Sequence, residues 1–133
     1  MDFNAKLSES CEAGETFYKL FYEHLDKKRN LMSHFYSDDS VVLWNGNAYT
    51  GSSSITSFYQ ALPSSEHVLH SVDCQPVSEV TGEQSTVIVT CEGEVKYEES
   101  NSQWEIFSHH FVLKKIGDVW KIVNDTFRVI PHS

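Results

Sequence analysis

The sequence predicts an α+β fold in which three N-terminal helices pack on one face of a curved antiparallel sheet. Through most of the first 62 residues, apolar side chains recur every three or four positions, which is typical of amphipathic helices. From residue 67 onward they alternate with polar side chains, which is typical of strands. Helices followed by a run of strands indicate segregated layers. No linker or repeat interrupts the 133 residues, so we expect one domain over residues 1–133.

Three helices are expected before the long strands. The first covers residues 7–25, because one of its stripes carries Leu7, Cys11, Gly14, Tyr18, Phe21 and Leu25. A short second helix covers residues 30–36, with Leu31 and Phe35 facing inward. The third begins near Gly51 and ends before Pro63, which cannot continue a helix. Its inward side chains are Ile55, Phe58, Tyr59 and Leu62.

A hairpin and four long strands complete the prediction. The sequence VVLW-NG-NAYT predicts a hairpin, because Asn45 and Gly46 both tolerate the positive φ of a type I′ turn. The long strands are expected at residues 67–77, 86–97, 104–115 and 119–130. Turn-forming residues at 81–83, 100–102 and 117–118 separate them, which predicts an antiparallel meander.

Charge and hydropathy exclude several classes of function. Ten Lys and Arg against nineteen Asp and Glu give a net charge of −9, which disfavours direct binding to nucleic acid. No run of 18 apolar residues could cross a membrane, and the N-terminus has no apolar signal segment. Three scattered cysteines suit a reducing compartment. We therefore expect an intracellular domain that touches neither nucleic acid nor membrane.

The segment from His67 to Cys74 contains residue types that bind metals or act as nucleophiles. On a strand, His70 and Cys74 would be about 13 Å apart, and His67 and Asp73 about 20 Å apart. Zinc ligands converge to about 2.0–2.3 Å from one ion, so neither pair can share a metal. His109 and His110 are neighbours on a strand and point to opposite faces. We therefore expect no metal, no cofactor and no catalytic residue here.

The last three strands separate into a core face and a mixed face. The core face carries Val87, Val89, Cys91, Val95, Phe107, His109, Phe111, Leu113, Val119, Val123, Asp125, Phe127 and Val129. The mixed face combines aliphatic, aromatic, hydroxyl and charged side chains, as protein interfaces do. We predict a partner interface formed by Ile88, Thr90, Ser108, His110, Val112, Trp120, Ile122, Asn124, Thr126 and Arg128. An arginine among aliphatic residues calls for an acidic group on the partner.

Three stretches resemble the nuclear transport factor 2-like family over essentially the whole chain: LWNGNAYTG, SFYQALPSSEHVLHSVDCQP and FSHHFVLKKIGDVWKIVNDTFR. Within them, WNGN, LPSS and DCQP are similar to the export-protein branch of that family. The resemblance implies a cone-like fold whose sheet pairs face to face with a second domain of the same fold. It also places Thr90, His110, Thr126 and Arg128 on the pairing face, with Arg128 opposite a partner aspartate.

In the export branch, the second domain belongs to the large mRNA-export receptor. That receptor carries RNA and engages the Phe-Gly repeats of nuclear pore proteins. The resemblance therefore implies a non-catalytic subunit that shuttles between nucleus and cytoplasm and meets mRNA and nucleoporins only indirectly.

Two alternatives stay open. One is a homodimeric import carrier for a GDP-bound small GTPase, but that carrier uses an acid pair where this chain has Glu98 and Ser100. The other is a small-molecule isomerase or dehydratase, for which His109, Asp125 and Asp73 are the candidate residues. The chain also has His109 where the family pattern has glutamine.

Overall fold

The structure is a computed structural model that describes residues 3–77, 86–98 and 103–130. The turns expected at residues 81–83 and 100–102, and with them Ser100, lie outside the described residues. The side chains of Leu7 and Cys11 lie outside the described part of the molecule as well.

The three expected helices are confirmed. They are α1 (Phe3–Lys27), the 3₁₀ helix η1 (Arg29–Phe35) and α2 (Ser52–Ala61). Phe21 and Leu25 of the predicted stripe are buried, and Phe17 and Tyr22 widen it. In η1, the fully buried position belongs to Met32, while Leu31 and Phe35 are only partly buried. A 3₁₀ helix repeats every three residues rather than 3.6, so it presents different side chains to the core.

Six strands form one sheet in the order β2-β1-β6-β5-β4-β3. Their bounds are β1 (Tyr36–Trp44), β2 (Asn47–Thr50), β3 (Ser65–Val77), β4 (Thr86–Tyr97), β5 (Glu105–Ile116) and β6 (Val119–Ile130). The NG hairpin joins β1 to β2, and Asn45 and Gly46 have φ values of 48° and 88°. The expected meander from β3 to β6 is antiparallel, but β1 pairs with β6 in parallel, so the sheet is mixed.

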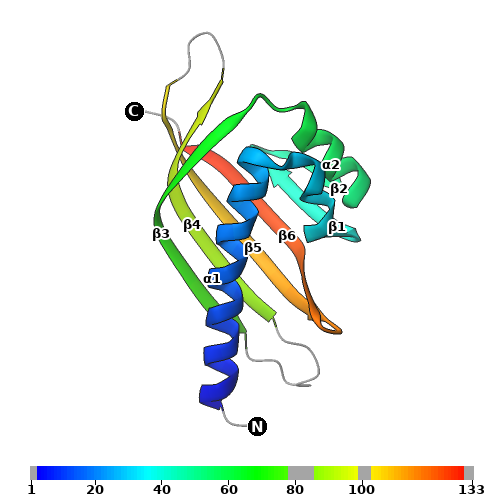
Figure 1. The fold of residues 1–133 in the computed structure, drawn as a ribbon, viewed down its shortest axis with the longest axis vertical. Coiled ribbons are helices and arrows are strands. Elements are labelled where there is room, and N and C mark those ends of the chain that lie inside the picture. The colour runs from blue at the N-terminus through cyan, green and yellow to red at the C-terminus, as the bar shows by residue number, and fades with distance from the viewer. Residues whose placement is uncertain (1–2, 78–85, 99–102, 131–133) are drawn as a thin grey trace.

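Helix α1 crosses one face of the long strands, while α2 and η1 cover the end of the sheet near β1 and β2 (Figure 1). The core lies between these helices and the sheet. The side chains predicted for the core face of β4 and β5 are all buried, from Val87 to Val95 and from Phe107 to Leu113. The opposite face of β3–β6 has no helix over it in the described residues, and we call it the open face.

Two β-bulges reverse the alternation of side chains part-way along a strand. In β3, Leu69 pairs with Gly93 of β4, and Ser71 pairs with Glu92, the residue just before Gly93. His70 therefore has no register partner in β4 and is the extra residue of the bulge. In β6, Val123 is extra in the same way, because Asn124 pairs with Val112 and Ile122 pairs with Leu113. Each insertion moves every residue on one side of it to the other face of the sheet.

Arg29 holds the connection between α2 and β3. Its guanidinium donates to the carbonyl oxygens of Tyr59, Leu62 and Pro63, and its Nε donates to the Leu25 carbonyl at the end of α1. Arg29 thus also caps the C-terminal end of α1. A planar guanidinium can serve several carbonyls at once, so one side chain fixes where β3 begins.

Candidate partner interface

The open face is defined by strand register, because directly paired residues share a face. Across β4, β5 and β6 it forms successive rows: Glu94-Ile106-Ile130, Glu92-Ser108-Arg128, Thr90-His110-Thr126 and Ile88-Val112-Asn124. Strand β3 extends the last three rows with Ser71, Asp73 and Gln75. The face therefore offers a broad four-stranded surface with polar and apolar residues side by side.

Eight of the ten residues predicted for the interface lie on this face. They are Ile88, Thr90, Ser108, His110, Val112, Asn124, Thr126 and Arg128. All are half-buried or exposed in the single chain. Near the centre, His110 Nδ1 lies 3.4 Å from the Thr90 hydroxyl on the neighbouring strand. Whether a partner covers these residues stays a prediction.

The prediction was wrong for Trp120 and Ile122, which lie on the helix side of the sheet. Ile122 is fully buried and pairs with the equally buried Leu113. Trp120 packs against the core and lines a groove of about 370 Å³ with Phe17 and Phe35. Simple alternation along the whole strand predicts the open face for both residues, but the extra residue at Val123 reverses the alternation.

The same bulge corrects the predicted core face of β6. Val119 was expected to face the core, but it is 53% exposed and pairs with Ile116, also 53% exposed, on the open face. Lys121 takes the open-face register position between Val119 and Asn124, where it pairs with Lys114, but its Nζ reaches the edge of η1 and donates to the His34 carbonyl at 2.6 Å.

Exposed aliphatic side chains at both ends of the open face were not among the residues predicted for the interface. Ile106 and Ile130 are each 43% exposed in one row, and Val68 of β3, at 40%, lies at the same end. Ile116 and Val119 form the other end. Large aliphatic groups left exposed in a continuous patch mark interaction surfaces. Counting outward apolar residues on every strand, beyond the centre of each, would have found them.

Arg128 is exposed on the open face. Within the described residues, no carboxylate lies at ion-pair distance from it. Its row neighbours are the hydroxyl of Ser108 and, one strand further, Glu92. Arg128 is thus free to meet an acidic group on another molecule.

The interior of the cone holds a buried polar network. The Tyr36 hydroxyl donates to Asp125 Oδ2 at 2.6 Å and lies 3.0 Å from the Tyr59 hydroxyl. His109 Nε2 lies 3.2 Å from Asp125 Oδ1, and His109 Nδ1 lies 3.0 Å from the Tyr22 hydroxyl. Since a carboxylate only accepts, the ring proton belongs on Nε2, and Nδ1 accepts from Tyr22.

Burial governs the ionisation of this network. It lowers the pKa of His109, although the nearby Asp125 partly offsets the shift, and it raises the pKa of Tyr22, Tyr36 and Tyr59 well above the ordinary tyrosine value. Burial also raises the pKa of Cys91 to about 12, although its contact with the Tyr22 side chain acts in the opposite direction. A thiol with so high a pKa is not a nucleophile at neutral pH.

The residues proposed for catalysis do not form an open site. His109 and Asp125 are each 0% exposed, so neither touches a space large enough for a water molecule. Aromatic rings fill the surroundings of His109, with Phe21, Phe111 and Phe127 at centroid distances of 5.5, 3.9 and 5.2 Å. Asp73 is exposed on the other side of the sheet.

The His67–Cys74 segment has structural contacts. His67 Nδ1 lies 2.6 Å from Asp26 Oδ1 of α1, and the Asp26 carboxylate also accepts from the Ser65 hydroxyl and the His67 backbone N–H. His70 lies on the open side, 3.6 Å from Glu94. Among the described residues, no three His, Cys, Asp or Glu side chains gather closely enough to hold a metal ion.

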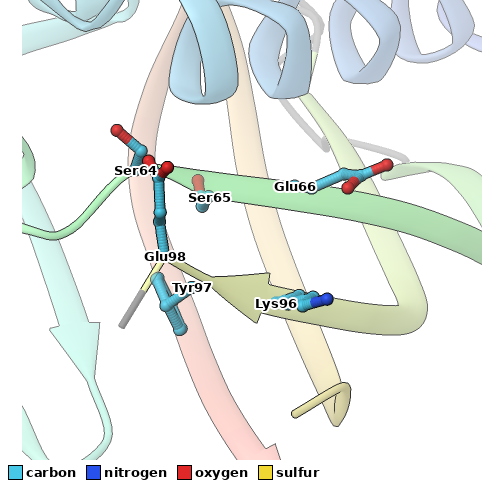
Figure 2. A pocket seen from close by; sticks show the side chains of 6 residues that line it. All are labelled: Ser64, Ser65, Glu66, Lys96, Tyr97 and Glu98. Carbon is cyan, nitrogen blue, oxygen red and sulfur yellow. The ribbon is translucent and has the colours of Figure 1, made fainter. Parts of the chain in front are cut away.

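A shallow surface cleft of about 370 Å³ lies where β3 begins and β4 ends (Figure 2). Its lining residues are Ser64, Ser65, Glu66, Lys96, Tyr97 and Glu98. The Glu98 backbone N–H donates to the Ser64 carbonyl at 2.8 Å, which ties the two strand ends together. Glu98, half of the expected acid pair, is thus in a polar cleft at the edge of the sheet.

The sequence from residue 13 to residue 129 matches the model of the nuclear transport factor 2 (NTF2) domain. The chain belongs to the NTF2 family. NTF2-related export protein 1 of Bos taurus is 41% identical over 133 residues, which cover 96% of this chain and 94% of that relative. This similarity confirms the resemblance to the export-protein branch of the NTF2 family.

Solved structures of NTF2-family proteins share the fold. Nuclear transport factor 2 from Cryptosporidium parvum superposes with a TM-score of 0.79 at 25% identity, covering 92% of this chain and 95% of that one. A chain of the Candida albicans Mtr2–Mex67 M domain complex gives a TM-score of 0.74 at 16% identity, covering 94% of this chain and 99% of that one. Within the described residues, no helix has the length and apolar character needed to cross a membrane.

Proposed function

We propose that this chain is a non-catalytic subunit that pairs, through its open face, with the NTF2-like domain of a large mRNA-export receptor. In this role it completes the receptor structurally, and it shuttles between nucleus and cytoplasm as part of the heterodimer. Contact with mRNA and with Phe-Gly nucleoporins is then indirect, which is consistent with the net charge of −9.

The observation that carries the proposal is the open face itself. It extends over four strands, mixes half-buried aliphatic and polar groups, and has exposed Ile106, Ile130, Ile116 and Val119 at its ends. Covering these aliphatic side chains with a partner sheet would remove apolar surface from water, which is favourable. The names of the export-protein relatives and the Mtr2–Mex67 complex support a second domain of the same fold as the partner.

Two other functions of this fold have weaker support. A homodimeric import carrier would use the same face, and Glu98 in the cleft of Figure 2 supplies part of its acid pair. An isomerase or dehydratase would need substrate to reach His109 and Asp125, which are fully buried.

Light scattering tests the proposal directly. The solution mass of the purified chain is measured alone and after mixing with the NTF2-like domain of the mRNA-export receptor from the same organism. We expect a stable one-to-one complex on mixing. A stable homodimer near twice 15.2 kDa that does not bind the receptor domain would contradict the proposal and favour the function of a homodimeric import carrier.

A further inference from the structure

Charged residues on the open face are separated by sign. Strands β3 and β4 carry an acidic strip, consisting of Asp73, Glu92 and Glu94, with Glu66 beyond it. Strands β5 and β6 carry a basic strip, consisting of Lys114 and Arg128. Lys121 also has an open-face register position, but its Nζ donates to the His34 carbonyl of η1 at 2.6 Å, so it is not counted in the strip. At the described open-face positions of β5 and β6 there is no carboxylate. The two acids within these strands, Glu105 and Asp125, lie on the helix side, and Asp118 lies in the exposed turn that joins the strands.

This separation is unlike the average composition of the chain. Nineteen acids and ten bases would favour acids on both halves of the face. The cation of the acidic half, Lys96, lies at the end of β4, 6.0 Å from the centre of the Trp104 ring. The two strips therefore have opposite signs along most of their length.

The strips remain available to another molecule. Two strand spacings separate β4 from β6, or about 10 Å, which is comparable to the screening length of physiological salt. Glu92 and Arg128 share a row across this gap without being at ion-pair distance. Glu94 lies 3.6 Å from His70, but both side chains stay half exposed, so that contact holds Glu94 only weakly.

From this geometry we infer that the open face selects the orientation of its partner by charge. The partner sheet carries basic side chains over Asp73, Glu92 and Glu94, and acidic side chains over Lys114 and Arg128. Turning the partner by half a turn in the plane of the interface would place like charges together, so complementary pairing favours one of the two orientations. The inference rests on the proposed heterodimer and adds the acidic half as a recognition element.

The test compares two double variants that change net charge equally. In one, Glu92→Lys and Glu94→Lys reverse the acidic strip. In the control, Glu12→Lys and Glu15→Lys change exposed residues of α1, away from the open face. Association and dissociation rates with the receptor's NTF2-like domain are measured at low and high salt. A milder pair, Glu92→Gln with Glu94→Gln, serves if the lysine variant does not fold.

We expect the strip variant to associate roughly tenfold more slowly than the wild-type chain at low salt, and the difference to shrink at high salt. The α1 control should stay within about twofold of the wild type, since its charges lie off the interface. Equal rates for the strip variant and the control would overturn the inference while leaving the heterodimer intact. Failure of the wild-type chain to bind, or pairing only with a second copy of itself, would overturn the proposed function and the inference together.

Discussion

Arg128 is the single residue on which the predicted interface depends most. In the isolated chain it is exposed, so its replacement should leave the fold unchanged. In a heterodimer its charge would be removed from water opposite a partner carboxylate. We expect Arg128→Ala to weaken the heterodimer by about 2–5 kcal/mol, because the partner's acid would be left buried and unpaired. Isothermal titration calorimetry with the receptor domain measures the change.

Lys27→Ala provides the control for Arg128→Ala. Lys27 is exposed at the end of α1, and removing it changes the net charge by the same amount. The Lys27→Ala protein should bind the receptor domain with the affinity of the wild-type chain. If Arg128→Ala also binds with wild-type affinity, Arg128 has no part in the interface.

His109 makes the core sensitive to acid. Because burial lowers its pKa, the folded chain binds fewer protons than the unfolded chain at mildly acidic pH. The stability contributed by a neutral His109 is therefore fully present above the ordinary histidine pKa of 6.5. It is lost as pH falls below 6.5 toward the folded pKa, at up to about 1.4 kcal/mol per pH unit.

Replacing His109 with glutamine, the residue of the family pattern, should remove this acid sensitivity. A glutamine amide can donate to Asp125 and accept from the Tyr22 hydroxyl, as the neutral ring does, but it does not titrate. Urea unfolding at pH 7.5 and pH 5.5 gives the free energy of unfolding for both proteins. The wild-type chain should lose more stability than His109→Gln, and an equal loss would show that His109 is not responsible.

At the scale of elements, the bulge in β3 depends on Gly93. A Cβ atom at this position would lie 2.1 Å from the Val68 carbonyl oxygen and 3.0 Å from Leu69 Cα, so backbone atoms would have to move. We expect Gly93→Ala to lower the free energy of unfolding by about 3 kcal/mol, through loss of pairing between β3 and β4. Thermal or urea unfolding of the variant and the wild-type chain measures this change in the free energy of unfolding.

Glu92→Ala is the matched comparison for Gly93→Ala, because Glu92 is the exposed neighbour on the same strand. Glu92→Ala should change the free energy of unfolding by no more than about 0.5 kcal/mol. A Gly93→Ala protein as stable as Glu92→Ala would mean that β3 can shift away from position 93 at little cost.

The bulges also explain where prediction from the sequence succeeded and failed. Strands β4 and β5 contain no extra residue, and their two faces followed from simple alternation. In β6 the residues after Val123 were placed correctly, whereas Trp120 and Ile122 before it were not. A bulge is decided by pairing with the neighbouring strand, which a single strand's pattern does not reveal. An interior glycine such as Gly93 is the local signal that could have indicated the β3 bulge.

At the scale of the whole molecule, local patterns predicted the element order, the NG hairpin and the helix-on-sheet layers. They could not predict the parallel pairing of β1 with β6, because nothing within either segment specifies its neighbour. For the same reason the buried contact of His109 with Asp125 and Tyr22 was not expected in detail, since it joins α1, β5 and β6.

The β1–β6 pairing has a consequence for how the protein is made. Val42 lies beside Asp125 and Trp44 beside Phe127, although each pair is more than eighty positions apart in the sequence. At about 5–20 residues per second, a ribosome needs on the order of ten seconds to synthesise the intervening chain. During that time the finished β1–β2 hairpin has no neighbouring strand to cover its apolar side chains. The β1 edge therefore stays without its strand partner until β6 has been synthesised, which lengthens the interval in which the nascent chain can aggregate.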